Sequence, residues 1–182
     1  GGGIIPFGGS IPIAKAMIGS GAGAPLLANG MNDAPLTPDH GYPLRTLVPG
    51  YIGARSVKWL GRIVVSDRPS PNHYVATAYK IVKKADAIEW AESGPIYRYP
   101  INAAICTPES ESKLTVGEID LTGYVLPTGR PGSTVQKVLV SADQGKRWTE
   151  ATMVGKDSEF CWQIWNAKVN ITATTKRLMV RA

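Results

Sequence analysis

Cationic and hydroxyl-bearing side chains are concentrated in the stretch from Thr37 to Ser66. His40 and Arg45 lie five residues apart around a Gly-Tyr-Pro turn, and Lys58 follows a Gly-Ala-Arg-Ser-Val run. Guanidinium and ammonium groups pair with phosphate oxygens, and glycine lets backbone N–H groups approach a ligand closely. These residue types indicate a pocket for an anionic, phosphorylated ligand, although their spacing alone does not name it.

Each of these side chains also has a plain structural interpretation. A single histidine is more often a hydrogen-bonded structural residue than a ligand, but a loop position between glycine and proline favours a site. Arg45 and Lys58 would also suit a solvated strand edge. We interpret Arg55 and Arg62 as structural residues whose aliphatic stems cover apolar surface.

Short strands and loops must position this cationic cluster. The apolar runs Thr46–Val48 and Ile63–Val65 indicate buried β segments on either side of Lys58. Farther upstream, Leu26–Ala28 has the composition of a short buried strand. By its local signal alone, Asn29-Gly30 is a hairpin turn.

Two helical segments are compatible with the sequence. Ser10 can cap a helix that begins at Ile11-Pro12, where an early proline is tolerated, and Ile13 and Met17 then share one face. Residues Ala85–Glu92 suit either a helical turn or a linker.

From Pro100 onward the sequence changes to short β-like runs. Six such runs at regular spacing predict a β-sandwich, and Asp143–Lys146 forms a tight turn between two of them. The runs are 101–107, 118–125, 135–141, 148–154, 160–165 and 177–180.

Apolar and polar residues alternate within these runs. Phe160, Trp162 and Ile164 alternate with Cys161 and Gln163. A period of two indicates that one strand face is buried and the other exposed.

The chain has two cysteines, Cys106 and Cys161. They are too few for a disulfide scaffold and lack metal-binding spacing, so we interpret both as buried thiols in β-strands. A disulfide across the sandwich is the alternative, although Trp148 lies too close to Cys161 to fit the immunoglobulin pattern.

Length and composition limit the possible classes. The 182 residues suit one domain or two small ones, and a hydrophobic share of 43% is enough for a core. No apolar run reaches the roughly 18 residues of a membrane span, and no signal-peptide pattern is visible. Because the first residue is not methionine, we expect an internal fragment of a longer protein. The net charge of +6 favours a basic surface with local anion binding over nucleic-acid binding, because the bases form no single run.

The cationic stretch resembles the molybdopterin-binding segment of the sulfite oxidase family, which includes eukaryotic nitrate reductases. The family pattern is roughly MNG-x-PL-x-x-DHG-[FY]-P-[VL]-R, followed by VPG-x-x-G-x-R-x-VKWL. This chain follows it at fixed spacing in Met31–Leu36, Asp39–Arg45, Val48–Gly50 and Gly53–Leu60. Later runs, among them GEIDLTGY and FCWQIW, resemble the family's dimerisation domain.

The resemblance implies a fold and a domain division. Residues 1–80 would form the C-terminal part of a mixed α/β molybdopterin domain. Residues 81–182 would form an immunoglobulin-like dimerisation domain that lacks its last strands. The expected fold class is therefore α+β, with mostly β structure.

The resemblance also implies which residues hold the cofactor. His40 would contact the pterin or its phosphate, and Arg45 would be the phosphate anchor. The remaining contacts to the phosphate would come from Ser56, Val57 and Lys58. The family's molybdenum-binding cysteine lies upstream of this chain, so we expect no metal ligand here.

Two positions that matter for the substrate depart from the family. Asn29 stands where sulfite-oxidising members carry a tyrosine beside the metal centre, and by itself it would be an ordinary turn residue. By the resemblance, Arg130 is the nearest match to a family arginine that reaches the substrate. The turn that contains Arg130 is about two residues longer than the corresponding turn of the family. An exposed turn arginine is an equally good interpretation.

The implied activity is oxygen-atom transfer to or from a small oxyanion, with sulfite ahead of nitrate. It would use a molybdenum-molybdopterin cofactor (Moco) in a homodimer, with an electron-transfer partner that could carry haem on another domain or protein. We expect the mitochondrial intermembrane space or the cytoplasm, and no nucleic-acid partner or membrane span. The alternative is a scaffold or dimerisation module that has lost its catalysis. The chain alone, without the metal-binding cysteine, is expected to be inactive.

Overall fold

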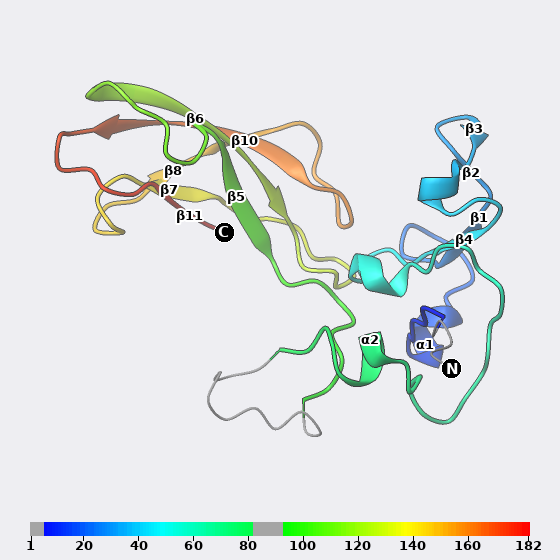
Figure 1. The fold of residues 1–182 in the computed structure, drawn as a ribbon. Helices are drawn as coiled ribbons and strands as arrows, with labels where there is room; N and C mark the ends of the chain where they lie inside the picture. The colour runs from blue at the N-terminus through cyan, green and yellow to red at the C-terminus, as the bar shows by residue number, and fades with distance from the viewer. Residues whose placement is uncertain (1–5, 82–92) are drawn as a thin grey trace. The chain divides into compact units, whose positions relative to one another are not determined.

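The computed structural model describes residues 6–81 and 93–182. The chain forms two compact units, of which the first ends at Tyr99 and the second begins at Pro100; Figure 1 shows the elements of both. The helical turn or linker expected at 85–92 lies outside the described residues. The domain boundary expected after Lys80 stays a prediction.

Residues 93–99 belong to the first unit and pack on its earlier segments. The Ile96 N–H donates to the Tyr79 carbonyl over 2.8 Å, and the Ile52 N–H donates to the Tyr97 carbonyl over 2.8 Å. Isolated antiparallel bridges join Tyr51 to Arg98 and Lys80 to Pro95. These contacts tie the end of the first unit to its centre.

The first unit is rich in loops and has only short regular elements. Strand β1 pairs antiparallel with β4, and β2 pairs antiparallel with β3. The elements are α1 Ile13–Ala16, β1 Leu26–Ala28, β2 Gly30–Met31, β3 Ala34–Pro35, the 3₁₀ turn η1 Pro38–His40, β4 Arg45–Leu47, the 3₁₀ turn η2 Gly53–Arg55 and α2 His73–Ala76.

The expected cap of the first helix is wrong. Helix α1 begins at Ile13 without a side-chain cap. The Ser10 hydroxyl instead accepts a hydrogen bond from the Ser70 N–H over 3.2 Å. Lys15 is the buried residue of α1, while Ile13 and Met17 are exposed. A helix of one turn has too few residues to form an amphipathic face, so the expected apolar stripe does not form.

Strand β1 forms where expected, but its leucines, Leu26 and Leu27, are exposed rather than buried. The neighbouring hairpin turns at Asn32-Asp33, not at Asn29-Gly30. Both turn residues have positive φ, 52° and 60°, as a type I′ turn requires. The Asn29 carbonyl accepts from the Leu36 N–H over 3.2 Å at the open end of the hairpin.

The apolar run at residues 63–65 is not a buried strand. Ile63, Val64 and Val65 are all exposed, Val65 to 81%, and lie outside any regular element. Val48, in the other apolar run, is buried. Leu47 beside it is 37% exposed, so the expectation of two buried segments holds only at Val48.

The second unit is an immunoglobulin-like β-sandwich, which confirms the predicted fold class. A four-stranded sheet has the order β5-β6-β10-β9, and a three-stranded sheet has the order β11-β7-β8. The strands are β5 Asn102–Thr107, β6 Gly117–Leu126, β7 Leu139–Ser141, β8 Thr149–Glu150, β9 Thr152–Val154, β10 Gln163–Ile171 and β11 Met179–Arg181.

One predicted strand serves both sheets. The run at 148–154 divides into β8, in the three-stranded sheet, and β9, in the four-stranded sheet. Between them, buried Ala151 donates its N–H to the Val138 carbonyl over 2.9 Å. This crossing helps close one side of the core.

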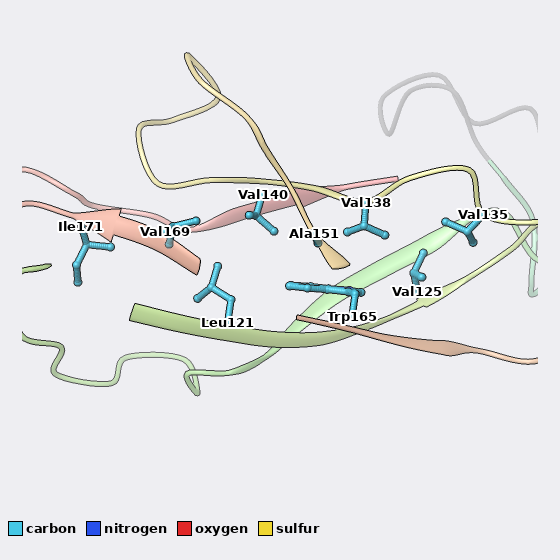
Figure 2. Packing of buried hydrophobic residues seen from close by; sticks show 9 residues of the cluster. All are labelled: Leu121, Val125, Val135, Val138, Val140, Ala151, Trp165, Val169 and Ile171. Atoms are coloured by element: carbon cyan, nitrogen blue, oxygen red, sulfur yellow. The ribbon is translucent and has the colours of Figure 1, made fainter. Parts of the chain in front are cut away.

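The core lies between the two sheets (Figure 2). Trp165 on β10 is its largest fully buried side chain, and its indole N–H donates to the Tyr124 carbonyl over 3.0 Å. The buried cluster comprises Leu121, Val125, Val135, Val138, Val140, Ala151, Trp165, Val169 and Ile171.

The residues of β10 that face the core are not the ones that the apolar pattern of its sequence predicts; we call this alternation the phase of the strand. Gln163 faces inward and is buried, whereas Trp162 and Ile164 are exposed. Trp165 determines this phase because it fills the core from the same strand face as Gln163.

The cysteine prediction is also wrong. Cys106 and Cys161 are both exposed and free, so they are neither buried thiols nor a disulfide. Cys106 falls where the register between β5 and β6 shifts, which interrupts the regular inward alternation.

The predicted turn between strands is confirmed. Gln144 and Gly145 have positive φ, 63° and 83°, within the connection from β7 to β8. The Ser141 hydroxyl accepts from the Gly145 N–H over 2.9 Å.

Candidate cofactor-binding site

The first unit brings together the segments that contain the predicted cofactor contacts. Strand β4 begins at Arg45, and the Thr46 N–H donates to the Val57 carbonyl over 2.9 Å. The Leu60 N–H donates to the Leu44 carbonyl over 2.8 Å. The segment around Lys58 therefore runs beside β4, although the two are distant in sequence.

Arg45 bridges the loops on either side of it. One terminal guanidinium nitrogen, Nη1, donates to the His40 carbonyl over 3.1 Å, and Nη2 donates to the Ser56 carbonyl over 3.3 Å. Nε donates to the Thr46 carbonyl over 3.4 Å. The side chain is half-buried, so its charge lies at the junction of the three segments.

Gly41 permits this close approach. It ends η1 in the left-handed conformation, with φ of 105°, and is buried. A Cβ placed there would lie 3.0 Å from the Lys58 Cβ and 3.2 Å from the Arg45 Cβ. The absence of a side chain at Gly41 therefore lets two cationic residues pack against the same turn.

Lys58 and Trp59 hold the η1 turn from the other side. The Lys58 ammonium donates to the Asp39 carbonyl over 2.8 Å, and the Trp59 indole N–H donates to the Pro38 carbonyl over 2.9 Å. The ammonium also lies 4.6 Å from the centroid of the Trp59 ring, a cation–π distance.

His40 is exposed at the end of η1. Its Nδ1 atom and the Thr37 hydroxyl lie within hydrogen-bonding distance, at 2.7 Å. This contact orients the imidazole. The same residue thus contributes its carbonyl to Arg45 and an exposed ring to the surface of the site.

Ser56 and Val57 contribute mainly through the backbone. The Ser56 hydroxyl accepts from the Val48 N–H over 3.1 Å, so it is used to fix the loop against β4. The Val57 carbonyl accepts from both the N–H and the hydroxyl of Thr46. These contacts hold the two residues beside Arg45.

Arg55 has a structural role through hydrogen bonds to backbone carbonyls. It is only 2% exposed and donates to the Ile96 carbonyl from Nε and Nη2, over 2.9 and 2.7 Å. A third bond, of 3.1 Å, goes to the Tyr74 carbonyl. Burial lowers the pKa of Arg55. Arg62, by contrast, is exposed.

Sequence reasoning missed two residues of this site. Trp59 holds η1 through its indole N–H and has a φ of 51°, which is uncommon for a bulky residue. Thr37 orients the imidazole of His40. The signal for Trp59 was its place directly after Lys58 in a loop.

The two residues that depart from the family pattern lie in different units. Asn29 follows β1, whose residue Ala28 pairs with Arg45, so it lies near the cationic site and is exposed. Arg130 is exposed in a turn of the second unit, where its carbonyl accepts from the Ser133 N–H over 3.1 Å.

The donor set fits a phosphate better than a metal ion. Arg45 and Lys58 pack around Gly41, and their guanidinium and ammonium groups donate to the adjacent carbonyls of His40 and Asp39. Such cationic donors suit phosphate oxygens. Within residues 6–81 and 93–182, no group of three or more His, Cys, Asp or Glu side chains is placed to hold a metal ion. In the same ranges, no helix is long and apolar enough to cross a membrane.

Comparison with known proteins defines the class of each unit. Residues 3–74 match the family model of the oxidoreductase molybdopterin binding domain. Residues 93–182 match that of the Mo-co oxidoreductase dimerisation domain. The chain therefore combines molybdopterin-binding and dimerisation modules.

Individual relatives agree with this class. Mitochondrial sulfite oxidase of Drosophila melanogaster is 36% identical over 94% of this chain and 31% of its own length. The Rattus norvegicus enzyme is 36% identical over 96% of this chain and 32% of its own. NADPH nitrate reductase of Aspergillus niger is 30% identical over 86% of this chain and 22% of its own.

The chain belongs to the sulfite oxidase family of molybdopterin oxidoreductases. It spans about a third of the length of these sulfite oxidases. Its fold also matches the crystal structure of the sulfane dehydrogenase SoxCD from Paracoccus pantotrophus. That match has a TM-score of 0.71 and 23% identity over 88% of this chain and 39% of the other.

Proposed function

We propose that this chain supplies the pterin-phosphate side of a molybdopterin oxidoreductase site, together with a dimerisation module. One observation carries the proposal: the Arg45 guanidinium bridges the His40 and Ser56 carbonyls beside Lys58. A preorganised arginine costs little ordering entropy when it receives a phosphate.

Each residue has a distinct role in this proposal. Arg45 and Lys58 pair with phosphate oxygens, and the exposed ring of His40 contacts the pterin or its phosphate. Ser56 and Val57 fix the loop that presents Lys58. The bound cofactor supplies the redox centre for oxygen-atom transfer, and its metal-binding cysteine comes from outside these 182 residues.

For the substrate, we propose a small oxyanion, with sulfite ahead of nitrate. The Drosophila and rat sulfite oxidases are 36% identical to this chain, compared with 30% for the Aspergillus niger nitrate reductase. Asn29 has a shorter, amide-bearing side chain where the family has a phenol, so turnover should differ from that of tyrosine-bearing relatives. Arg130 is the proposed substrate contact from the second unit.

The remaining partners follow from the same proposal. The protein acts as a homodimer and exchanges electrons with a partner protein or domain, which can carry haem. The mitochondrial intermembrane space or the cytoplasm is the proposed location, since the relatives include mitochondrial enzymes. The 182-residue chain by itself transfers no oxygen atom.

A second candidate is a scaffold that keeps the fold without catalysis. The bonds from Arg45 to backbone carbonyls favour it, because the same bonds would brace an empty loop. The exposed Asn29 is consistent with this reading.

The test is molybdenum and pterin content in the longer protein that contains this chain. We expect about one molybdenum per subunit in the wild type and at least a tenfold loss in Arg45→Ala, because the phosphate loses its anchor. Arg68→Ala removes an exposed arginine whose Nε lies 3.7 Å from a carboxylate oxygen of its neighbour Asp67, and should retain the metal.

Arg45→Lys distinguishes a lost anchor from a collapsed loop. Lysine keeps the charge without the planar fork, so partial cofactor retention is expected. A well-folded wild type without molybdenum would establish the scaffold instead. Full cofactor content in Arg45→Ala would show that Arg45 does not anchor the cofactor phosphate.

A further inference from the structure

Asn29 is the one asparagine in the sequence that a glycine follows, and it lies at a bend between two strands. Strand β1 ends before it at Ala28, and β2 begins after it at Gly30. Asn29 and Gly30 are both exposed. Asparagine is a thermally labile residue, because the backbone nitrogen that follows it can attack the side-chain amide. A glycine leaves that nitrogen without steric cover.

The hydrogen bonds of the β2–β3 hairpin direct the Gly30 N–H outward. The Asn29 carbonyl accepts from the Leu36 N–H over 3.2 Å, so it points to the β3 side of the hairpin. Because a peptide unit is planar and trans, the Gly30 N–H points the opposite way, to the other edge of β2. Within residues 6–81 and 93–182, β2 pairs with β3 alone. The Gly30 nitrogen is therefore open to solvent next to the Asn29 side chain.

The strand register agrees with this direction. Gly30 lies opposite Pro35, which has no N–H to donate. Hydrogen-bonded and non-hydrogen-bonded pairs alternate along an antiparallel ladder, and the bond between Asn29 and Leu36 makes the next pair a non-hydrogen-bonded one. The hairpin therefore forms its ladder without using the Gly30 N–H.

We propose that Asn29 is a site of spontaneous modification, at which the side-chain amide becomes a succinimide and then aspartate or isoaspartate. The Gly30 nitrogen loses its proton to hydroxide and attacks Cγ of Asn29. The new N–Cγ bond replaces the bond from Cγ to the amide nitrogen, which leaves as ammonia after taking a proton from water. Water then opens the ring at Cγ, which gives aspartate, or at the main-chain carbonyl carbon, which gives isoaspartate. No atom is oxidised or reduced.

The modification changes both charge and chain geometry. Either product has a carboxylate in place of a neutral amide, directly after Ala28, whose partner on β4 is Arg45. Isoaspartate also carries the main chain through the side-chain carbons, which lengthens it at the junction of β1 and β2. The reaction needs neither a cofactor nor a partner, so it proceeds whether or not the cofactor proposal holds.

The test is peptide mapping by mass spectrometry of the folded 182-residue chain during incubation in mildly alkaline buffer. We expect Asn29 to convert at least tenfold faster than Asn32, which is also exposed and lies in the same hairpin. Asn32 is the matched reference because aspartate follows it, and that side chain shields the attacking nitrogen. Asn29→Gln should abolish the acidic product of this peptide, because glutamine would have to close a larger ring.

The same incubation in guanidinium chloride separates the effect of the fold from that of the sequence. Because the Gly30 nitrogen is already open to solvent, we expect the folded-state rate at Asn29 to lie within about threefold of the unfolded-state rate. A slower folded-state rate would show that the fold protects this site and would overturn the proposal. Equal rates at Asn29 and Asn32, or an unchanged acidic product in Asn29→Gln, would overturn it as well. Molybdenum content tests the cofactor proposal separately.

Discussion

At the residue scale, Gly123 makes room for the central tryptophan of the sandwich. It pairs with Trp165 across β6 and β10. A Cβ at this position would lie 2.0 Å from the Ala104 carbonyl oxygen and 2.2 Å from Cζ2 of Trp165. Neither neighbour can yield easily, because one belongs to a paired strand and the other fills the core.

We therefore expect Gly123→Ala to lower the free energy of unfolding by about 3 kcal/mol, the upper part of the usual overpacking range. Urea denaturation, followed by tryptophan fluorescence, measures the change. Gly61→Ala adds the same methyl group where no atom beyond the adjacent residues lies within 4 Å of it, and should change stability by less than about 0.5 kcal/mol. Equal effects of the two substitutions would contradict the packing argument.

At the element scale, the turn between β7 and β8 is organised around one carboxylate. Asp143 accepts from the Arg147 N–H and from the Ser141 hydroxyl, each over 2.9 Å. These bonds, led by that of Arg147, lower the pKa of Asp143. Trp148 completes the turn by donating its indole N–H to the Gly145 carbonyl over 2.9 Å.

This turn predicts a pH dependence of stability. Because the folded-state pKa of Asp143 is lowered, its contribution is present above the unfolded-state pKa, about 3.9, and is lost as the pH falls through the folded-state pKa. The stability difference between wild type and Asp143→Asn should be largest near neutral pH and disappear in acid. Urea denaturation from neutral pH to about pH 2 measures it.

The control for this prediction is Asp157→Asn, which removes one negative charge from an exposed loop. If the difference in unfolding free energy between Asp143→Asn and wild type did not change with pH, proton binding by Asp143 would not contribute to stability. That outcome would contradict the role given to the carboxylate.

At the scale of the whole molecule, the two proposed functions belong to different units. Arg45 and Lys58 lie in the first unit, and the sandwich that matches the dimerisation domain model forms the second. Arg55 hydrogen-bonds to backbone carbonyls within the first unit. The cluster around Trp165 forms the core of the second unit. Cofactor binding and dimerisation should therefore respond to different substitutions.

In the longer protein, Arg45→Ala should lose molybdenum and retain wild-type dimer affinity, because Arg45 lies in the first unit. Metal analysis and sedimentation equilibrium on this variant and the wild type provide the comparison. Loss of both properties in the folded variant would show that the two functions are coupled.

The sequence by itself determined the family, the sandwich and the likeness of residues 37–60 to a cofactor site. These depend on local patterns: short β runs, the residues of the β7–β8 turn, and motifs at fixed spacing in one continuous stretch. The roles of His40, Arg45, Ser56, Val57 and Lys58 stay predictions. These residues lie close together in the folded chain because Gly41 lacks a side chain and because the segment around Lys58 pairs beside β4.

Only the tertiary structure decided which residues are buried. Trp165 sets the phase of β10, so Gln163 is inside and Ile164 outside, against the local apolar pattern. Ile63–Val65 is apolar yet exposed, and the run at 148–154 divides between two sheets. Burial depends on what another part of the chain places opposite a residue, and a local pattern contains no record of that partner.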